Sequence, residues 1–143
     1  MFVSGNEPVY DRAVADLDDV RRIALALPGA SEGRSGDGDQ VGFSVENKGK
    51  WRGFAWSWLE RVEPKKPRVA RPDVLAVRVV DLEDKEVLLA SNERGLFTEP
   101  HCNGFPAVLV RLPETVLDEL AELLTDAWRI QAPAALVREH DEG

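Results

Sequence analysis

A histidine, the single cysteine of the chain and an asparagine are adjacent at His101, Cys102 and Asn103. These residue types suit two chemistries, acyl transfer by an activated thiolate and coordination of a metal ion. Neighbouring residues of an extended chain point to opposite sides, so the imidazole of His101 is poorly placed to activate the thiol of Cys102. The only other histidine is His140, and one histidine with one cysteine does not complete a closed zinc site. Neither chemistry is favoured.

The same segment is typical of a turn that leads into a strand. The bend falls at Asn103-Gly104, and Phe105 is expected to enter the core. Trp56, His101 and Asn103 form the candidate pocket for a small ligand. We expect no catalytic residue, no cofactor and no metal site, and therefore a protein that is not an enzyme.

Electrostatic attraction of an anion is a third chemistry, and it is concentrated between Lys48 and Arg71. This stretch holds eight lysines and arginines against two glutamates, which gives it a charge of +6. The whole chain has a formal net charge of -8, so the remainder carries -14. Cations interleaved with tryptophans are typical of surfaces that follow a nucleic-acid backbone and stack on its bases. The candidate contact residues are Lys48, Lys50, Trp51, Arg52, Lys65, Lys66, Arg68 and Arg71.

Other interpretations of these charges stay open. The overall acidity opposes a polyanion at long range, so the basic stretch is also compatible with a solvated hairpin and a linker. The acidic helices or an exposed sheet face would suit a protein partner or a second copy. A divalent ion held loosely by Asp118, Glu119 and Glu122 is a further hypothesis, although such charges usually serve solubility. The sequence does not indicate an oligomeric state.

The composition indicates a single folded domain in a reducing compartment. The chain has 143 residues, of which 43% are hydrophobic and 31% charged, as in ordinary globular domains. One cysteine cannot form an internal disulfide. No secretory pattern begins the chain, and no apolar stretch approaches the roughly 18 residues of a membrane span. We therefore expect a cytoplasmic protein without membrane contact.

The elements that must position these side chains begin with an amphipathic helix. Apolar residues at helical spacing follow Asp16, which is expected to cap the helix, and Pro28-Gly29 end it. The glycines and aspartates of residues 31–40 are expected to form a loop.

A β-hairpin is expected over residues 41–62, with its turn at Gly49. On the returning strand Phe54, Trp56 and Trp58 alternate with other residues, so they are expected to share one face.

The second half of the chain alternates between sheet and helix. Prolines are expected to keep residues 63–73 irregular. β-Branched residues predict a strand over 74–80. A short helix is expected after Asp81, with a strand that begins at Val87 as the alternative. Further strands are expected at 96–97 and 107–111.

The strongest pattern is an apolar stripe over residues 116–128, which predicts a helix packed on the sheet. Thr115 and Asp118 resemble a capping box, and His140 is expected in a terminal tail. Short strand connections predict an α+β two-layer sandwich, a mainly antiparallel sheet with the N- and C-terminal helices on one face. The expected organisation is an arm at 1–15, one domain at 16–137 and a tail at 138–143.

Three stretches in this order resemble the MmcQ/YjbR family, also called DUF419. They are DLDDVRRIALALPGASE, WRGFAWSWLE and EPHCNGFPAVLVRLPETVLDELAELLTDAWRIQAP, and the resemblance covers residues 16–136. It implies a CyaY-like (frataxin-like) α+β fold. Members are often described as DNA-binding through a double-wing arrangement, so the resemblance implies nucleic acid as the partner and residues 47–50 as a wing. It implies no catalytic residue.

Overall fold

The computed structural model of the chain describes residues 15–35, 40–60, 69–91, 95–99, 102 and 104–142. The elements in chain order are α1 (Leu17–Leu25), β1 (Ala30–Ser35), β2 (Gln40–Asn47), β3 (Lys50–Glu60), β4 (Val69–Arg78), α2 (Leu82–Ala90), β5 (Leu96–Phe97), β6 (Ala107–Arg111), the short 3₁₀ turn η2 (Leu112–Glu114), α3 (Leu117–Gln131) and α4 (Ala134–Glu142).

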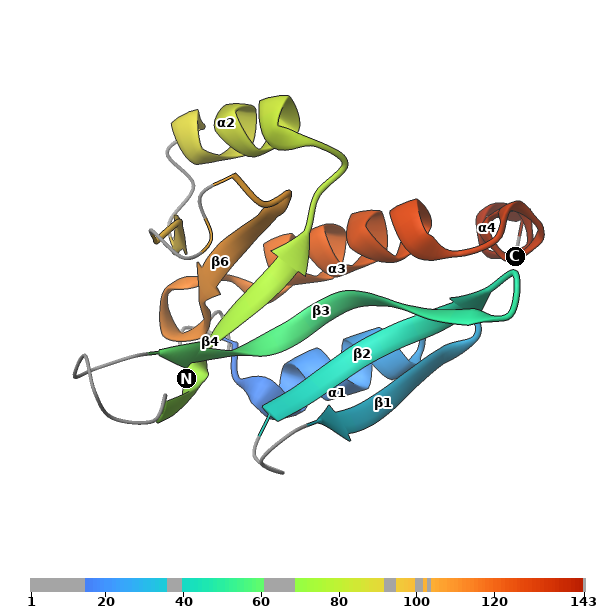
Figure 1. Ribbon diagram of the computed structural model, residues 1–143, viewed down its shortest axis with the longest axis horizontal. Helices are drawn as coiled ribbons and strands as arrows, with labels where there is room; N and C mark the ends of the chain where they lie inside the picture. Colours follow the sequence, from blue (N-terminus) through green and yellow to red (C-terminus); the bar gives the residue numbers. More distant parts are fainter. Residues whose placement is uncertain are drawn as a thin grey trace, which may run out of the picture.

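The strands form one sheet in the order β1-β2-β3-β4-β6-β5, and each neighbouring pair is antiparallel. Helices α1 and α3 lie together on one face of this sheet (Figure 1). The α+β sandwich with both terminal helices on one face, predicted from the sequence, is confirmed.

β1 corrects the prediction of a loop over residues 31–40. It pairs with β2 from Ala30, opposite Val45, to Ser35, opposite Gln40. Glycine and serine favour strands weakly, but a well-patterned neighbour supplies a complete hydrogen-bond ladder for them. Residues 36–39 lie outside the described part.

β4 begins inside the connector predicted over residues 63–73, and it ends at Arg78 rather than at residue 80. Pro72 lies where the register between β3 and β4 is irregular, between the pairs Ser57–Leu75 and Trp58–Arg71. Proline is tolerated at such an irregularity because no ladder hydrogen bond is lost there. Residues 61–68 lie outside the described part.

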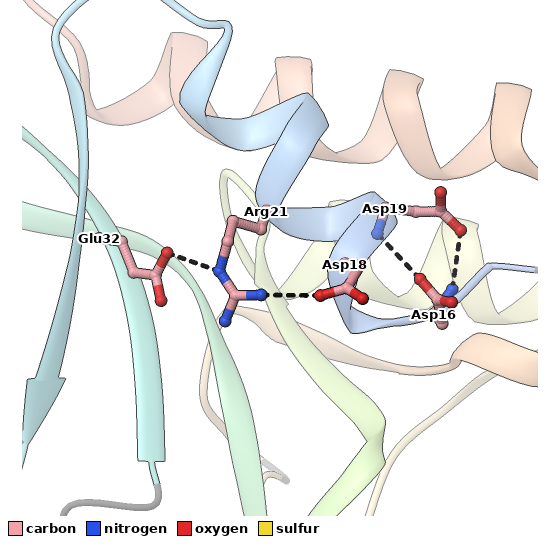
Figure 2. Close-up of polar contacts among 5 residues, drawn as sticks. All are labelled: Asp16, Asp18, Asp19, Arg21 and Glu32. Atoms are coloured by element: carbon pink, nitrogen blue, oxygen red, sulfur yellow. Dashed lines mark hydrogen bonds and ion pairs between the residues drawn. The ribbon is translucent and has the colours of Figure 1, made fainter.

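The N-terminus of α1 carries the predicted cap. The carboxylate of Asp16 accepts a hydrogen bond from the Asp19 backbone at 2.9 Å, and the carboxylate of Asp19 accepts one from the Asp16 backbone at 3.1 Å (Figure 2). From the same helix Arg21 donates to Glu32 of β1 at 2.7 Å and to Asp18 at 2.9 Å. The hydrogen bond to Glu32 is the main reason that the pKa of Arg21 is raised. These contacts fix α1 against the edge strand.

Of the caps predicted for α2 and α3, one is confirmed and one is wrong. α2 begins at the predicted cap, since the Asp81 carboxylate accepts from the Asp84 backbone at 2.8 Å. The capping box predicted for α3 is wrong: its N-cap is Val116, without a side-chain cap. The hydroxyl of Thr115 instead donates to the carbonyl of Arg111 at 2.8 Å, which closes the turn before the helix.

The helix-covered face holds the main core, with Trp128 of α3 at its centre. Trp128 is fully buried, and its Nε1 donates to the carbonyl of Pro28 at 2.9 Å. The ring of His140 lies 5.2 Å from the Trp128 ring, so His140 is part of α4 rather than of a free tail. α4 continues to Glu142, beyond residue 137 where the domain was expected to end. Other buried members include Phe43, Phe54, Val77, Val108, Leu120 and Leu124.

Candidate functional site

The opposite face of the sheet, called here the open face, carries a smaller cluster. In Figure 1 no described helix is drawn in front of β1, β2 and β3, and α1 lies behind β2. The two tryptophans predicted on β3, Trp56 and Trp58, are half-buried here. The buried members of this cluster are Val74, Ala76, Cys102, Ala107 and Leu109.

An irregularity in β3 sends its aromatic residues to different faces. The register with β2 skips Phe54, because its neighbours Gly53 and Ala55 pair with successive residues of β2. Phe54 and Ala55 are both buried in the helix-side core, while Trp56 and Trp58 pack on the open face. The prediction that the three aromatics share one face is therefore wrong, since one extra residue at a bulge reverses the alternation.

A buried lysine holds the turn before β6 over part of the open face. Lys85 is 5% exposed, and its Nζ donates to the carbonyls of Cys102 at 2.6 Å and Phe105 at 3.0 Å. Cys102 is buried, and its thiol donates to the carbonyl of Ala107 at 3.4 Å. The turn predicted in this segment is thus a covering element in which Cys102 is packed away from solvent.

Of the predicted pocket residues, only Trp56 falls in the described part, and His101 and Asn103 lie outside it. Phe105 does not enter the core as predicted. It is 43% exposed and meets Trp56 edge to face, with ring centroids 6.0 Å apart. The guanidinium carbon of Arg78 lies 5.6 Å from the centre of the Phe105 ring. Two rings and one cation therefore meet on the open face.

A shallow groove with a volume of about 220 Å³ lies beside Trp56 on the open face. Glycine on three adjacent strands keeps much of its floor at the level of the backbone. The residues that line it are Gly33, Gly42, Phe43, Ser44, Gly53, Ala55 and Trp56.

The turn between β2 and β3 presents the basic residues that the sequence singled out. Lys48 and Gly49 have φ angles of 56° and 80°, as a two-residue type I′ turn requires, so the turn predicted at Gly49 is confirmed. Lys48, Lys50, Trp51 and Arg52 are all exposed, and Trp51 is 59% exposed. Within the described residues, none of these three cations takes part in an ion pair.

Two hydrogen bonds fix the base of this turn to the C-terminal end of α3. The side chain of Asn47 donates to the Gln131 carbonyl at 3.0 Å. The side chain of Gln131 in turn donates to the carbonyl of Gly53 at 2.9 Å. The exposed cations are thus carried by a hairpin of defined position.

The rest of the predicted basic surface is not described. Lys65, Lys66 and Arg68 lie outside the described residues. Arg71 lies on β4 opposite Trp58, and its side chain is outside the described part. The surroundings of the predicted basic surface are therefore described only for its residues on the β2–β3 hairpin.

The acidic residues of α3 gather beside a different groove. Glu119, Glu122 and Asp126 line it together with apolar residues of α2 and β5, and its volume is about 250 Å³. Among the described residues, no three histidine, cysteine or acidic side chains are placed to hold one metal ion. Asp118, Glu119 and Glu122 therefore do not form such a group. No helix in the described ranges is long and apolar enough to cross a membrane.

Three residues that matter to the open face were missed by reasoning from sequence. Arg78 follows Val74 and Ala76 at a spacing of two, which was a usable signal for a cation on that face. Gly33 falls in the loop predicted over residues 31–40, and Lys85 falls in the short helix predicted after Asp81. No sequence signal shows that the Lys85 ammonium turns inward.

Comparison with known proteins gives both a fold and relatives. The structure is similar to the crystal structure of DR2400 from Deinococcus radiodurans, a DUF419 domain, with a TM-score of 0.59 and 23% identity over 88% of each chain. It is also similar to the crystal structure of a protein from Pseudomonas syringae, with a TM-score of 0.53 and 18% identity over 78% of this chain and 97% of the other. The fold class is therefore that of the DUF419 domain.

The relatives by sequence are three uncharacterised mycobacterial proteins: Mb2600 of Mycobacterium bovis, and MT2646 and Rv2570 of Mycobacterium tuberculosis. Each is 38% identical over 134 residues, which cover 87% of this chain and 95% of the relative. No protein-family model matches the chain. The chain belongs to the same family as these mycobacterial proteins, and the predicted MmcQ/YjbR (DUF419) resemblance is confirmed.

Proposed function

We propose that the chain is a non-enzymatic protein that binds nucleic acid through the β2–β3 hairpin. The observation that carries the proposal is Trp51, which is 59% exposed beside the exposed cations Lys48, Lys50 and Arg52. Lysine and arginine neutralise phosphates and release their counterions. An exposed indole offers a face on which a base stacks.

The charge balance sets the kind of binding to expect. The net charge of -8 repels a polyanion at long range, so attraction is confined to the surface near the hairpin. We therefore expect weak binding that falls steeply as salt is raised. The same partner is implied by the resemblance to the MmcQ/YjbR family, although at the level of the fold alone.

A non-enzymatic role is part of this proposal. Cys102 is 3% exposed, and its thiol donates a hydrogen bond to a carbonyl. The Lys85 ammonium lies 3.7 Å from its sulfur, but a reactive cysteine also needs access to solvent, which burial denies to Cys102. Cys102 fits a packing role instead.

The test is fluorescence anisotropy with labelled single- and double-stranded oligonucleotides over a series of salt concentrations. The double variant Lys48→Glu/Lys50→Glu is expected to lower affinity more than tenfold and to reduce the salt slope by about 2, since each phosphate contact contributes roughly 0.7–0.9. The control is Arg22→Glu/Arg138→Glu, which changes the net charge equally on α1 and α4. It should bind within about threefold of the original chain.

Two results would contradict the proposal. One is no binding of either oligonucleotide by the unmodified chain at about 50 mM salt, where phosphate contacts are strong. The other is an equal loss in both double variants, because the net charge and not the hairpin would then govern binding.

A further inference from the structure

Arg78 is a cation on the open face with an unsatisfied nitrogen. Its side chain is half-buried, and its Nε is buried with no hydrogen-bond partner among the described residues. A buried donor without an acceptor costs free energy. Arginine is the side chain that holds phosphate or carboxylate through several donors at once. The half-buried guanidinium therefore suits an anionic ligand, while the Nε itself is covered by protein atoms.

The groove beside Trp56 is kept shallow by glycines of β1, β2 and β3. Gly33 and Gly42 are paired across β1 and β2, and Gly42 is opposite Trp56. A Cβ added at Gly33 or Gly53 would meet nothing within 4 Å, and neither residue has a positive φ. Glycine inside a strand weakens it, and it often marks a bulge or the close approach of a ligand or another backbone. Gly53 lies at the bulge of β3, whereas the pairing of Gly33 with β2 is regular.

The register places the cation between the half-buried Trp56 and the exposed Trp51. Trp56 pairs with Ala76, and β3 and β4 are antiparallel. Arg78 therefore lies on the side of Trp56 that leads along β3 through Gly53 to Trp51. Gly53 and Trp51 are two residues apart and face the same side. Trp56 thus lines the groove, and Arg78 lies on the neighbouring strand in the direction of the basic hairpin.

We infer that the open face holds one unpaired strand of nucleic acid, with a base in the groove against Trp56 and a backbone phosphate on Arg78. The inference rests on the proposed function and narrows its ligand to single strands. A base enters such a groove only when it is out of a duplex stack, and aromatic faces bind unpaired bases with little sequence preference. The next phosphate along the strand meets Lys48, in the turn between β2 and β3.

The experiment compares a single strand of about 12 nucleotides with its blunt duplex by fluorescence anisotropy, a length within the site sizes of single-strand binders. Gly33→Val fills the groove from the edge strand with a residue that favours strands. Ser31→Val is the matched control, because it lies on the same strand two residues away and does not line the groove. Arg78→Gln removes the charge beside the groove. Thermal unfolding confirms that each variant is folded.

Gly33→Val and Arg78→Gln are each expected to lower single-strand affinity at least fivefold, the lower end for one lost stacked base. Duplex affinity should change less than about twofold in both variants, and Ser31→Val should match the unmodified chain for both ligands. Equal losses for strand and duplex would overturn the inference. So would unchanged single-strand binding in both variants while Lys48→Glu/Lys50→Glu still abolishes it, an outcome that leaves the proposed function standing. No binding by the unmodified chain overturns both.

Discussion

Trp128 and Trp56 lie on opposite faces of the same sheet. Trp128, on α3, is 0% exposed in the core between the helices and the sheet, and its ring nitrogen donates to the carbonyl of Pro28. Trp56 is half-buried, and Phe105, which packs against it, is itself 43% exposed. On one face the chain completes its own packing, and on the other it leaves large rings and a cation partly uncovered. The covered face accounts for stability, and the open face is where a ligand would gain most.

The same substitution on the two faces gives the largest expected contrast. Trp128→Ala should lower the free energy of unfolding by about 3–5 kcal/mol, because it opens a cavity in a closed core. Trp56→Ala should cost less, roughly 2 kcal/mol, because part of that ring is exposed and its loss opens no closed cavity. Urea unfolding followed by circular dichroism measures both values. Equal losses would mean that the open face is packed as tightly as the covered one.

Lys85 tests how firmly the covering turn is held over the open face. Lys85→Met keeps the volume but leaves the carbonyls of Cys102 and Phe105 without their donor, at an expected cost of about 1–3 kcal/mol. The thiol of Cys102 should then react faster with an alkylating reagent, because the turn opens more often. Lys50→Met, at an exposed position, is the control and should change neither quantity. An unchanged alkylation rate in Lys85→Met would show that the turn is held by other contacts.

Replacing a glycine by alanine is expected to have a smaller effect on stability, and a different one in the two regions. Gly95 has a φ of 89°, and an added Cβ would lie 2.5 Å from the Thr115 hydroxyl. Gly95→Ala should therefore destabilise the protein by more than about 1 kcal/mol. Gly33→Ala meets nothing within 4 Å, so it should be neutral or stabilising by roughly 0.5 kcal/mol. Thermal unfolding midpoints check the order. Destabilisation by Gly33→Ala would show a structural need for that glycine and weaken the case for a ligand groove.

The contrast between the faces also explains what the sequence predicted well. The covered face depends on local, periodic patterns: the stripe around Trp128, the cap at Asp16 and the strand over 107–111 were all predicted. The open face depends on register. One skipped residue at Phe54 decides which rings are exposed, and no local pattern reports such a skip.

The candidate site divides in the same way. Its hairpin half was predicted, because charge and turn type are properties of the local sequence. Its groove half was missed, because Arg78 and Gly33 come together only through the pairing of strands distant in the sequence.

The smallest expected effect concerns the outer edge of the covered face, where α4 is held to α3. The Arg129 guanidinium donates to both carboxylate oxygens of Asp141, at 2.8 Å and 2.6 Å. The hydrogen bond from Arg129 is the main reason that the pKa of Asp141 lies below its ordinary value of 3.8. A carboxylate with a lowered pKa stabilises the folded state above the unfolded pKa, and this contribution is lost as the pH falls through the folded value.

Asp141→Asn should therefore reduce the fall in the thermal unfolding midpoint between about pH 5 and about pH 3. The change should be slight, because both partners are solvent-exposed and such pairs contribute little. Glu139→Gln is the matched control, since Glu139 lies on the same helix and makes no ion pair among the described residues. If both variants reduce the fall in the unfolding midpoint equally, the fall comes from general charge repulsion and not from loss of the Arg129 contact. The ion pair with Arg129 would then contribute little to holding α4 on the covered face.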